Sequence, residues 1–341
     1  YYGFDHIDMV TGHGVHAGGH YLEWFRDRHP DWAEMLDPAN ELPHNYSCPQ
    51  ANRTPIPEDS YHTAFIRDRA LAYLRDNAGS EAPLFTYVSF PDPHHPFNPP
   101  GRYWDLYDPD AFDLPLRYRD HRDPPPPLRA MRADFEAGRG PLTPQTAFMA
   151  EDRHIREAMA LTAGMIAMID DAVGNIVEAL RDTGRARNTV IVFNADHGDY
   201  MGDFNLLLKG AWPREAITRV PMIWCDPADG RPALRDDLCS TVDLAPTILD
   251  RAGLTPFFGM QGHSLLDDAR GGAGSRDSLL VEYNDVGARM GFDSAARVRT
   301  VITPDWHLSV YRGEDWGELY DRRGDPDHLC NLWLSDANAR V

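Results

Sequence analysis

The run Thr189-Val-Ile-Val-Phe-Asn-Ala-Asp-His-Gly-Asp199 constrains the fold of this chain more than any other stretch. Its apolar, β-favouring residues Val190 to Phe193 predict a strand buried on both faces, as in a parallel sheet. The strand stops at Asp196 and His197, and ligands of such sheets bind beyond the carboxyl ends of the strands. A carboxylate oxygen beside an imidazole nitrogen suits a divalent metal. The alternative interpretation is an N-cap aspartate followed by a turn.

Composition narrows the class of protein. The 341 residues suffice for one large or two modest domains, and 33 Lys and Arg against 53 Asp and Glu give a formal net charge of −20. This charge argues against nucleic acid as a partner, although a metal or local bases could still attract an anionic substrate. The four cysteines form no zinc-type pair and no disulfide framework, and no apolar run reaches membrane-spanning length. The sequence therefore does not indicate whether the protein is cytoplasmic, periplasmic or secreted.

Helical and strand patterns alternate over most of the chain. Amphipathic helices are predicted over residues 60–77, 152–183 and 241–252, and buried-type strands over 84–90, 189–195 and 219–225. Ser60 is the predicted N-cap of the first helix, and Gly184 is predicted to end the second. This alternation predicts an α/β fold with a mostly parallel central sheet flanked by helices.

Two stretches differ from this pattern. Residues 98–147 are proline-rich and irregular, which predicts a surface excursion that could act as a lid or as an oligomer interface. Short strand patterns over 278–283, 297–302, 306–311 and 318–321 predict a small antiparallel sheet. We therefore expect an α/β core over residues 1–265 and a small C-terminal α+β subdomain over 266–341.

Further candidate site residues follow the strands. Prolines fix His94 and His95 just after the predicted strand 84–90, where a histidine could protonate a leaving group or bind an anion. The alternative is that the prolines merely end the strand and the histidines are solvated. Lys209 follows Asp196 by thirteen residues and could neutralise a sulfate or phosphate oxygen, whereas a lone lysine is more often solvated.

Three histidines near the start, His13, His16 and His20, are spaced by three and four residues. A second metal site is one interpretation. The glycines between them favour a loop with surface or hydrogen-bonded histidines.

An ordered set of motifs covers most of the chain. These are Phe85-Thr-Tyr-Val-Ser-Phe-Pro-Asp-Pro-His-His-Pro-Phe97, Met168-Ile-Asp-Asp-Ala-Val-Gly174, Asn194-Ala-Asp-His-Gly-Asp-Tyr-Met-Gly202, Lys209-Gly, Arg219-Val-Pro-Met-Ile, Asp243-Leu-Ala-Pro-Thr-Ile-Leu249, Met260-Gln-Gly-His-Ser-Leu265, and Glu318-Leu-Tyr-Asp321 with Asp325-Pro and Asn331-Leu. Each motif is weak alone, but the ordered set resembles the sulfatase family of the alkaline phosphatase superfamily. The resemblance implies an alkaline phosphatase-like fold and hydrolysis of a sulfate ester.

The resemblance also implies residue roles. Asp196 and His197 match a pair of metal ligands, usually to calcium, so one divalent metal is expected, Ca²⁺ or else Mn²⁺. His94 matches the histidine that contacts the ester oxygen and can protonate the leaving group. Lys209 matches the lysine that binds the transferred sulfuryl oxygens. His95 fills a variable position, and no role is carried over to it.

The nucleophile of the family has no match in this chain. Family members oxidise a cysteine in C-x-P-S-R to formylglycine and bind the metal also through an early Asp-Asp pair, both in a segment that would precede Tyr1. Cys48 is followed by Pro-Gln-Ala-Asn, and Asp229 follows Cys225 where arginine is needed. We therefore expect an incomplete chain that is inactive alone.

Three functions compete. The first is a sulfatase acting on a small-molecule or saccharide sulfate ester; the acidic charge favours a small ester over long polysulfated chains. The second is a phosphonate monoester or phosphodiester hydrolase of the same superfamily, because a phosphodiester and a sulfate ester share charge and shape. The third is a non-catalytic, sulfatase-like binding protein, against which the joint presence of Asp196, His197, His94 and Lys209 argues.

Overall fold

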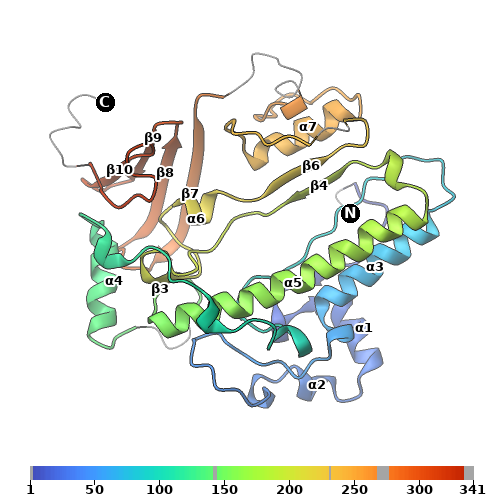
Figure 1. Cartoon of the computed structure of the whole chain (residues 1–341), viewed down its shortest axis with the longest axis horizontal. Coiled ribbons are helices and arrows are strands. Elements are labelled where there is room, and N and C mark those ends of the chain that lie inside the picture. Colours follow the sequence, from blue (N-terminus) through green and yellow to red (C-terminus); the bar gives the residue numbers. More distant parts are fainter. Residues whose placement is uncertain (1–2, 141–143, 230–231, 267–275, 334–341) are drawn as a thin grey trace.

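One long helix, α5 (Asp152–Asp182), runs through the molecule beside α3 (His62–Asp76) (Figure 1). The structure, a computed structural model, describes residues 3–140, 144–229, 232–266 and 276–333. Buried residues along α5 belong to three hydrophobic clusters, as its apolar spacing of three and four requires. Gly184 follows with a φ of 72°, so the predicted helix and its glycine end are confirmed.

By length and composition, α5 could also cross a membrane. Its residues Ile155, Leu161 and Met165, however, pack in one cluster with Phe97 and Phe148 from other parts of the chain. This packing places that face of α5 in the protein core.

The remaining helices are short. Besides α3 and α5, the α-helices of the described residues are α1 (His20–Arg28), α2 (Trp32–Met35), α4 (Pro126–Glu136), α6 (Glu215–Thr218) and α7 (Leu244–Arg251). The predicted helix 241–252 is present as a 3-10 turn, Thr241–Asp243, followed by α7. The predicted cap at Ser60 is wrong, because Ser60 lies in a separate 3-10 turn and its hydroxyl donates to Asp59 Oδ1. No side chain caps α3.

Strand β4 (Ile191–Asn194) pairs with β6 (Met222–Cys225) as an antiparallel ribbon, which crosses Figure 1 between α5 and α7. Ile191 packs against the cluster of Leu74, Ala179 and Leu180. The prediction that this strand is buried on both faces is wrong, because within the described residues β6 is its one partner strand and Phe193 is 39% exposed.

Residues 84–90 form no strand, which contradicts the prediction. Phe85 and Tyr87 are exposed, since no strand of the described chain pairs with this segment. The predicted parallel central sheet is likewise absent from the sheets formed by the described residues, all of which are antiparallel.

The C-terminal part confirms the predicted antiparallel sheet. Its strands are β7 (Leu279–Ala288), β8 (Ala295–Ile302), β9 (Trp306–Tyr311) and β10 (Gly317–Asp321), in the order β10-β9-β8-β7. The other strands of the described residues are two residues long and form two antiparallel ribbons. One pairs β1 (Val10–Thr11) with β2 (Gly18–Gly19), and the other pairs β3 (Phe148–Met149) with β5 (Leu206–Leu207). The predicted border at 265/266 lies beside residues 267–275, which are outside the described part.

The C-terminal sheet shares its core with the rest of the chain. Met290 and Phe292 pack in one cluster with Leu128 of α4 and with Trp212. The excursion over residues 98–147 therefore contributes to the core through α4, although most of it is irregular as predicted.

A buried ion pair adds a polar link between the same parts. Arg214 Nη2 donates to Glu318 Oε1 at 2.5 Å, and both side chains are almost fully buried. Arg214 also contacts His121 Nε2 of the excursion at 3.2 Å, while Tyr320 donates to Glu318 at 2.7 Å.

Candidate active site

The loop that carries His94 and His95 is anchored by a buried carboxylate. Asp92 is 5% exposed and accepts hydrogen bonds from Thr63 Oγ1 at 2.6 Å and Tyr61 Oη at 3.4 Å. These partners stand at the start of α3. The Asp92–Pro93 and His95–Pro96 peptide bonds are cis. The chain thus fixes this loop beside α3 without a strand to support it.

His94 is a half-buried, neutral imidazole in this environment. Burial lowers its pKa to about 4, and Lys209, His13 and His197 act in the same direction. Its Nδ1 donates to the carbonyl oxygen of His95 at 2.5 Å. In the neutral ring Nε2 therefore carries a lone pair and no proton. Nε2 must gain a proton before His94 can act as an acid. His95 itself is 4% exposed, so the alternative of solvated histidines is wrong for His95.

His13 lies against His94. Their ring centroids are 3.7 Å apart and their planes differ by 7°. Gly14 lets the two loops meet, because a Cβ there would lie 2.6 Å from Asn98 Nδ2, and its φ of 52° suits glycine. Sequence reasoning took His13 for a surface or metal-site histidine. Only the tertiary stacking reveals it as a neighbour of His94.

Lys209 follows β5 and is half-buried. Its carbonyl accepts from Ala147 N at 2.9 Å, and Leu208 before it is fully buried with a strained φ of 61°. Burial lowers the pKa of Lys209, while Asp199 and Asp196 oppose that shift. Within the described chain its ammonium forms no salt bridge, which leaves the charge available to an anion.

The sequence contains a second indication for Lys209, on which the prediction did not rest. Lys209 is the only lysine among the 341 residues, and all other side-chain ammonium or guanidinium groups belong to arginine. A compact ammonium and a planar guanidinium are not interchangeable in a site. The presence of the chain's one lysine at this position is a stronger indication of a site residue than its spacing from Asp196.

Asp196 and His197 lie just beyond the carboxyl end of β4. Asp196 is 86% exposed in its side chain and His197 is 39% exposed, with Oδ2 and Nε2 3.6 Å apart. His197 Nδ1 donates to the carbonyl of Gly198 at 2.9 Å, which leaves Nε2 free to bind a cation. Gly198 is required here, because a Cβ would clash with the carbonyl oxygen of Ala216.

The loops bring these candidates into one electrostatic neighbourhood. His94 responds to both Lys209 and His197, and Lys209 responds to Asp196 and Asp199. Asp199 Oδ1 is buried and has no hydrogen-bond partner in the described part of the chain. A carboxylate and an imidazole next to such an orphaned oxygen fit a divalent cation. Residues that the structure describes supply no cluster of three or more ligand side chains, so the pair alone does not complete a site.

Two of the cysteines are poorly placed for a nucleophile. Burial raises the pKa of the Cys48 thiol, which packs with Phe97 and Phe148. Cys225 pairs with Ile191, at the end of β4 remote from Asp196.

Comparison with known proteins identifies the family of the chain. A family model described as Sulfatase matches residues 7–254, and one described as N-sulphoglucosamine sulphohydrolase, C-terminal, matches residues 209–341. An arylsulfatase of Clostridium perfringens is 29% identical over 322 residues, which cover 93% of this chain and 62% of the arylsulfatase. The chain spans 62%, 59% and 58% of the first three curated relatives.

Solved structures share the fold. The phosphonate monoester hydrolase of Agrobacterium radiobacter superposes with a TM-score of 0.73 at 26% identity, covering 94% of this chain and 66% of that one. A protein solved with its substrate D-glucosamine-2-N,6-O-disulfate gives a TM-score of 0.66 at 20% identity, covering 82% and 66%. These likenesses identify an alkaline phosphatase-like α/β fold.

Proposed function

The chain belongs to the sulfatase family. We therefore propose that it is part of a sulfuric ester hydrolase that cleaves a sulfate monoester. The observation that carries this proposal is the meeting of His94, Lys209 and the Asp196–His197 pair in one neighbourhood within the matched region. The arylsulfatase relative supports sulfate as the transferred group. The net charge of −20 favours a small-molecule or saccharide ester over a long polysulfated chain.

In this proposal each residue has one task. Lys209 holds the non-bridging oxygens of the sulfuryl group and neutralises charge that grows during transfer. His94 faces the ester oxygen with Nε2, because its Nδ1 is held by the carbonyl of His95. A proton on Nε2 would pass to the departing alcohol or phenol. Asp196 and His197 would hold one divalent cation, Ca²⁺ or Mn²⁺, which supplies Lewis-acid neutralisation when bound.

We also propose the finer fold, a mostly parallel central sheet. Residues 84–90 and β4 both lead into site residues at their carboxyl ends, so the two segments run in the same direction into the site. In the described chain β4 has a partner strand on one edge only, and residues 84–90 pair with no strand. A further strand added between them would bury Phe85, Tyr87 and Phe193. Slow amide exchange over 84–90 in the product of the whole coding sequence would support this sheet, and fast exchange there would contradict it.

The second candidate is a phosphonate monoester or phosphodiester hydrolase, favoured by the likeness to the Agrobacterium radiobacter enzyme. To separate the two, we would assay the product of the whole coding sequence on a nitrophenyl sulfate and a nitrophenyl phosphonate. A higher kcat/KM for the sulfate is expected. A higher value for the phosphonate would favour the second candidate, and hydrolysis of neither would contradict both.

The role of His94 has its own test. In His94→Ala, alkyl esters with poor leaving groups should lose more activity than nitrophenyl esters, whose leaving group needs little protonation. Equal losses for both substrates would remove His94 as the proton donor.

A further inference from the structure

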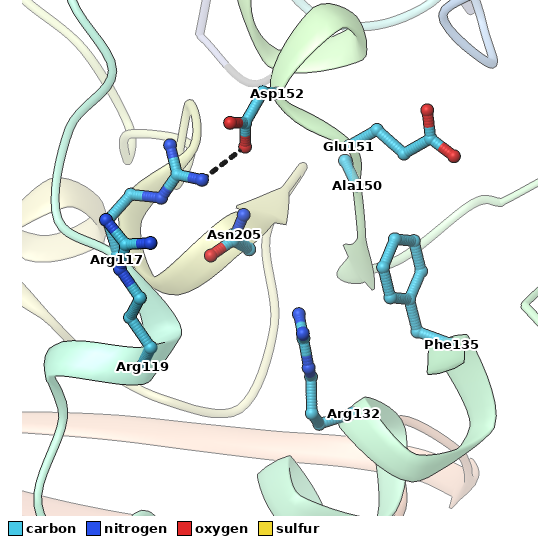
Figure 2. A pocket seen from close by; sticks show the side chains of 8 residues that line it. All are labelled: Arg117, Arg119, Arg132, Phe135, Ala150, Glu151, Asp152 and Asn205. Carbon is cyan, nitrogen blue, oxygen red and sulfur yellow. Dashed lines mark hydrogen bonds and ion pairs between the residues drawn. The ribbon is translucent and has the colours of Figure 1, made fainter. Parts of the chain in front are cut away.

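A cavity outside the neighbourhood of His94 and Lys209 gathers hydrogen-bond donors. It has a volume of about 340 Å³ and is lined by Arg117, Arg119, Arg132 and Asn205, with Phe135 and the start of α5 (Figure 2). We call it the arginine pocket. In a chain with a net charge of −20, three guanidinium groups around one cavity need an explanation.

Asn205 is the buried centre of the arginine pocket. It is 7% exposed, and its Oδ1 accepts from Tyr118 N at 3.1 Å. Its Nδ2 has no acceptor in the described part of the chain and is not among the fully buried orphan atoms, so this amide donor is open to the cavity. Asn205 adopts a φ of 62°, which asparagine tolerates better than most residues, so the backbone conformation fits this orientation.

The arginines keep donors free. Arg132 uses Nε for Glu136 at 2.8 Å and lies over Phe135, with its guanidinium carbon 5.6 Å from the ring centroid, so its terminal nitrogens remain available. Arg119 has Asp120 as its paired carboxylate, at 3.9 Å, and its side chain is 80% exposed. Arg117 pairs with Asp152 but keeps a buried Nε without a partner among the described residues.

Acceptors are scarce in the same cavity. Asp152 is already engaged by Arg117, and in Figure 2 the carboxylate of Glu151 is turned away from the guanidinium groups. The N-terminus of α5 also lacks a side-chain cap, so its first backbone N–H groups add positive potential. Donors from four side chains and a long helix thus face one space.

We propose that the arginine pocket binds an oxyanion, a sulfate or a carboxylate, whose carrier lies against Phe135. Guanidinium groups and a side-chain amide match the planar or tetrahedral oxygens of such groups. The site is separate from Lys209. Ala150 pairs with Asn205 at one end of the β3–β5 ribbon, and Ala147 pairs with Lys209 at the other. Lys209 is not among the residues that line the arginine pocket. The proposal does not depend on the function proposed above.

The test counts sulfate sites by equilibrium dialysis of the full chain with radiolabelled sulfate at low ionic strength. Wild type is expected to bind at the arginine pocket and at Lys209. Arg119→Gln/Arg132→Gln should weaken the first site at least tenfold and spare the second, and Lys209→Met should do the reverse. Arg139→Gln, which removes an exposed arginine paired with Asp134 just beyond α4, is the matched control and should change neither.

Two further variants keep the result decisive. Arg119→Gln alone changes an exposed side chain that no fold contact requires, and a severalfold loss is still expected. Arg119→Lys/Arg132→Lys keeps the charge but loses the forked donors, and should bind with intermediate affinity. If acetate competes with the labelled sulfate, the pocket binds carboxylates. If acetate does not compete, the pocket is a sulfate site. Binding that is unchanged by both arginine variants, or that is lost only in Lys209→Met, would overturn the proposal.

Discussion

At the scale of single residues, the environment of the candidate site disfavours the protonated, charged form of two basic side chains. Burial lowers the pKa of Lys209 and brings that of His94 to about 4. An anion that arrives beside them would reverse both shifts, because a negative charge favours the protonated forms. The site is therefore arranged to gain electrostatic energy when an oxyanion binds.

Lys209→Met is expected to lower kcat/KM by about a hundredfold or more, by analogy with the removal of a donor to a developing negative charge. The methionine keeps the length and loses the charge. Activity is measured with an aryl sulfate on the product of the whole coding sequence, and Arg139→Gln serves as a control for lost surface charge. An unchanged kcat/KM would remove Lys209 from the site.

His94 should titrate near pH 4 in the ligand-free protein, below the ordinary histidine value of 6.5. Its protonated fraction therefore falls about tenfold per pH unit above that point. The shift of its ring protons by NMR between pH 3 and 8 measures this. His13→Ala should raise the pKa, since it removes a stacked ring that excludes water, and added sulfate should raise it as well. A midpoint near 6.5 that neither change moves would contradict the description of the site.

At the scale of elements, local patterns gave more correct predictions than non-local ones, although the cap at Ser60 was wrong and the C-terminal antiparallel sheet was right. The helix over 152–183 is visible in the spacing of its apolar residues, and its end at Gly184 is a local backbone property. The burial of Val190–Phe193 depends on strands far away in sequence, and so does the pairing of residues 84–90. The contact of His13 with His94 is tertiary as well, and no spacing rule could have predicted it.

Two glycines of α5 make a matched pair. A Cβ on Gly164 would clash with the carbonyl oxygen of Tyr103, whereas a Cβ on Gly174 would meet nothing within 4 Å. Gly174→Ala should therefore stabilise the protein by up to about 1 kcal/mol through helix propensity. Gly164→Ala should destabilise it, because the loop at Tyr103 must move. Urea unfolding followed by circular dichroism measures both, and equal effects of the same sign would contradict this account of the contact.

At the scale of the whole molecule, the C-terminal sheet and the rest of the chain share both a hydrophobic cluster and the buried pair of Arg214 with Glu318. The sequence suggested a separate subdomain because its strand pattern differs in texture. Sequence patterns do not reveal which residues complete a common core. We expect the two parts to unfold in a single transition.

Arg214→Met should destabilise the protein by about 3–5 kcal/mol, because it leaves the carboxylate of Glu318 buried without its partner. Arg214→Met/Glu318→Leu should recover much of that loss, since an apolar pair removes the uncompensated charge. Denaturant unfolding of these two variants, of Glu318→Leu alone and of the wild type gives the comparison. A double variant as unstable as the sum of its single changes would show that the pair is not coupled.

The single lysine has a practical consequence for following this protein. An endoproteinase that cuts only after lysine has one target bond, Lys209–Gly210, and Gly210 is buried against Met290. Cleavage requires that bond to open, so the native chain should resist digestion while the unfolded chain yields just two fragments, 1–209 and 210–341. Counting bands on a gel would then report at once whether the candidate site is closed, and a bound anion should slow the cut.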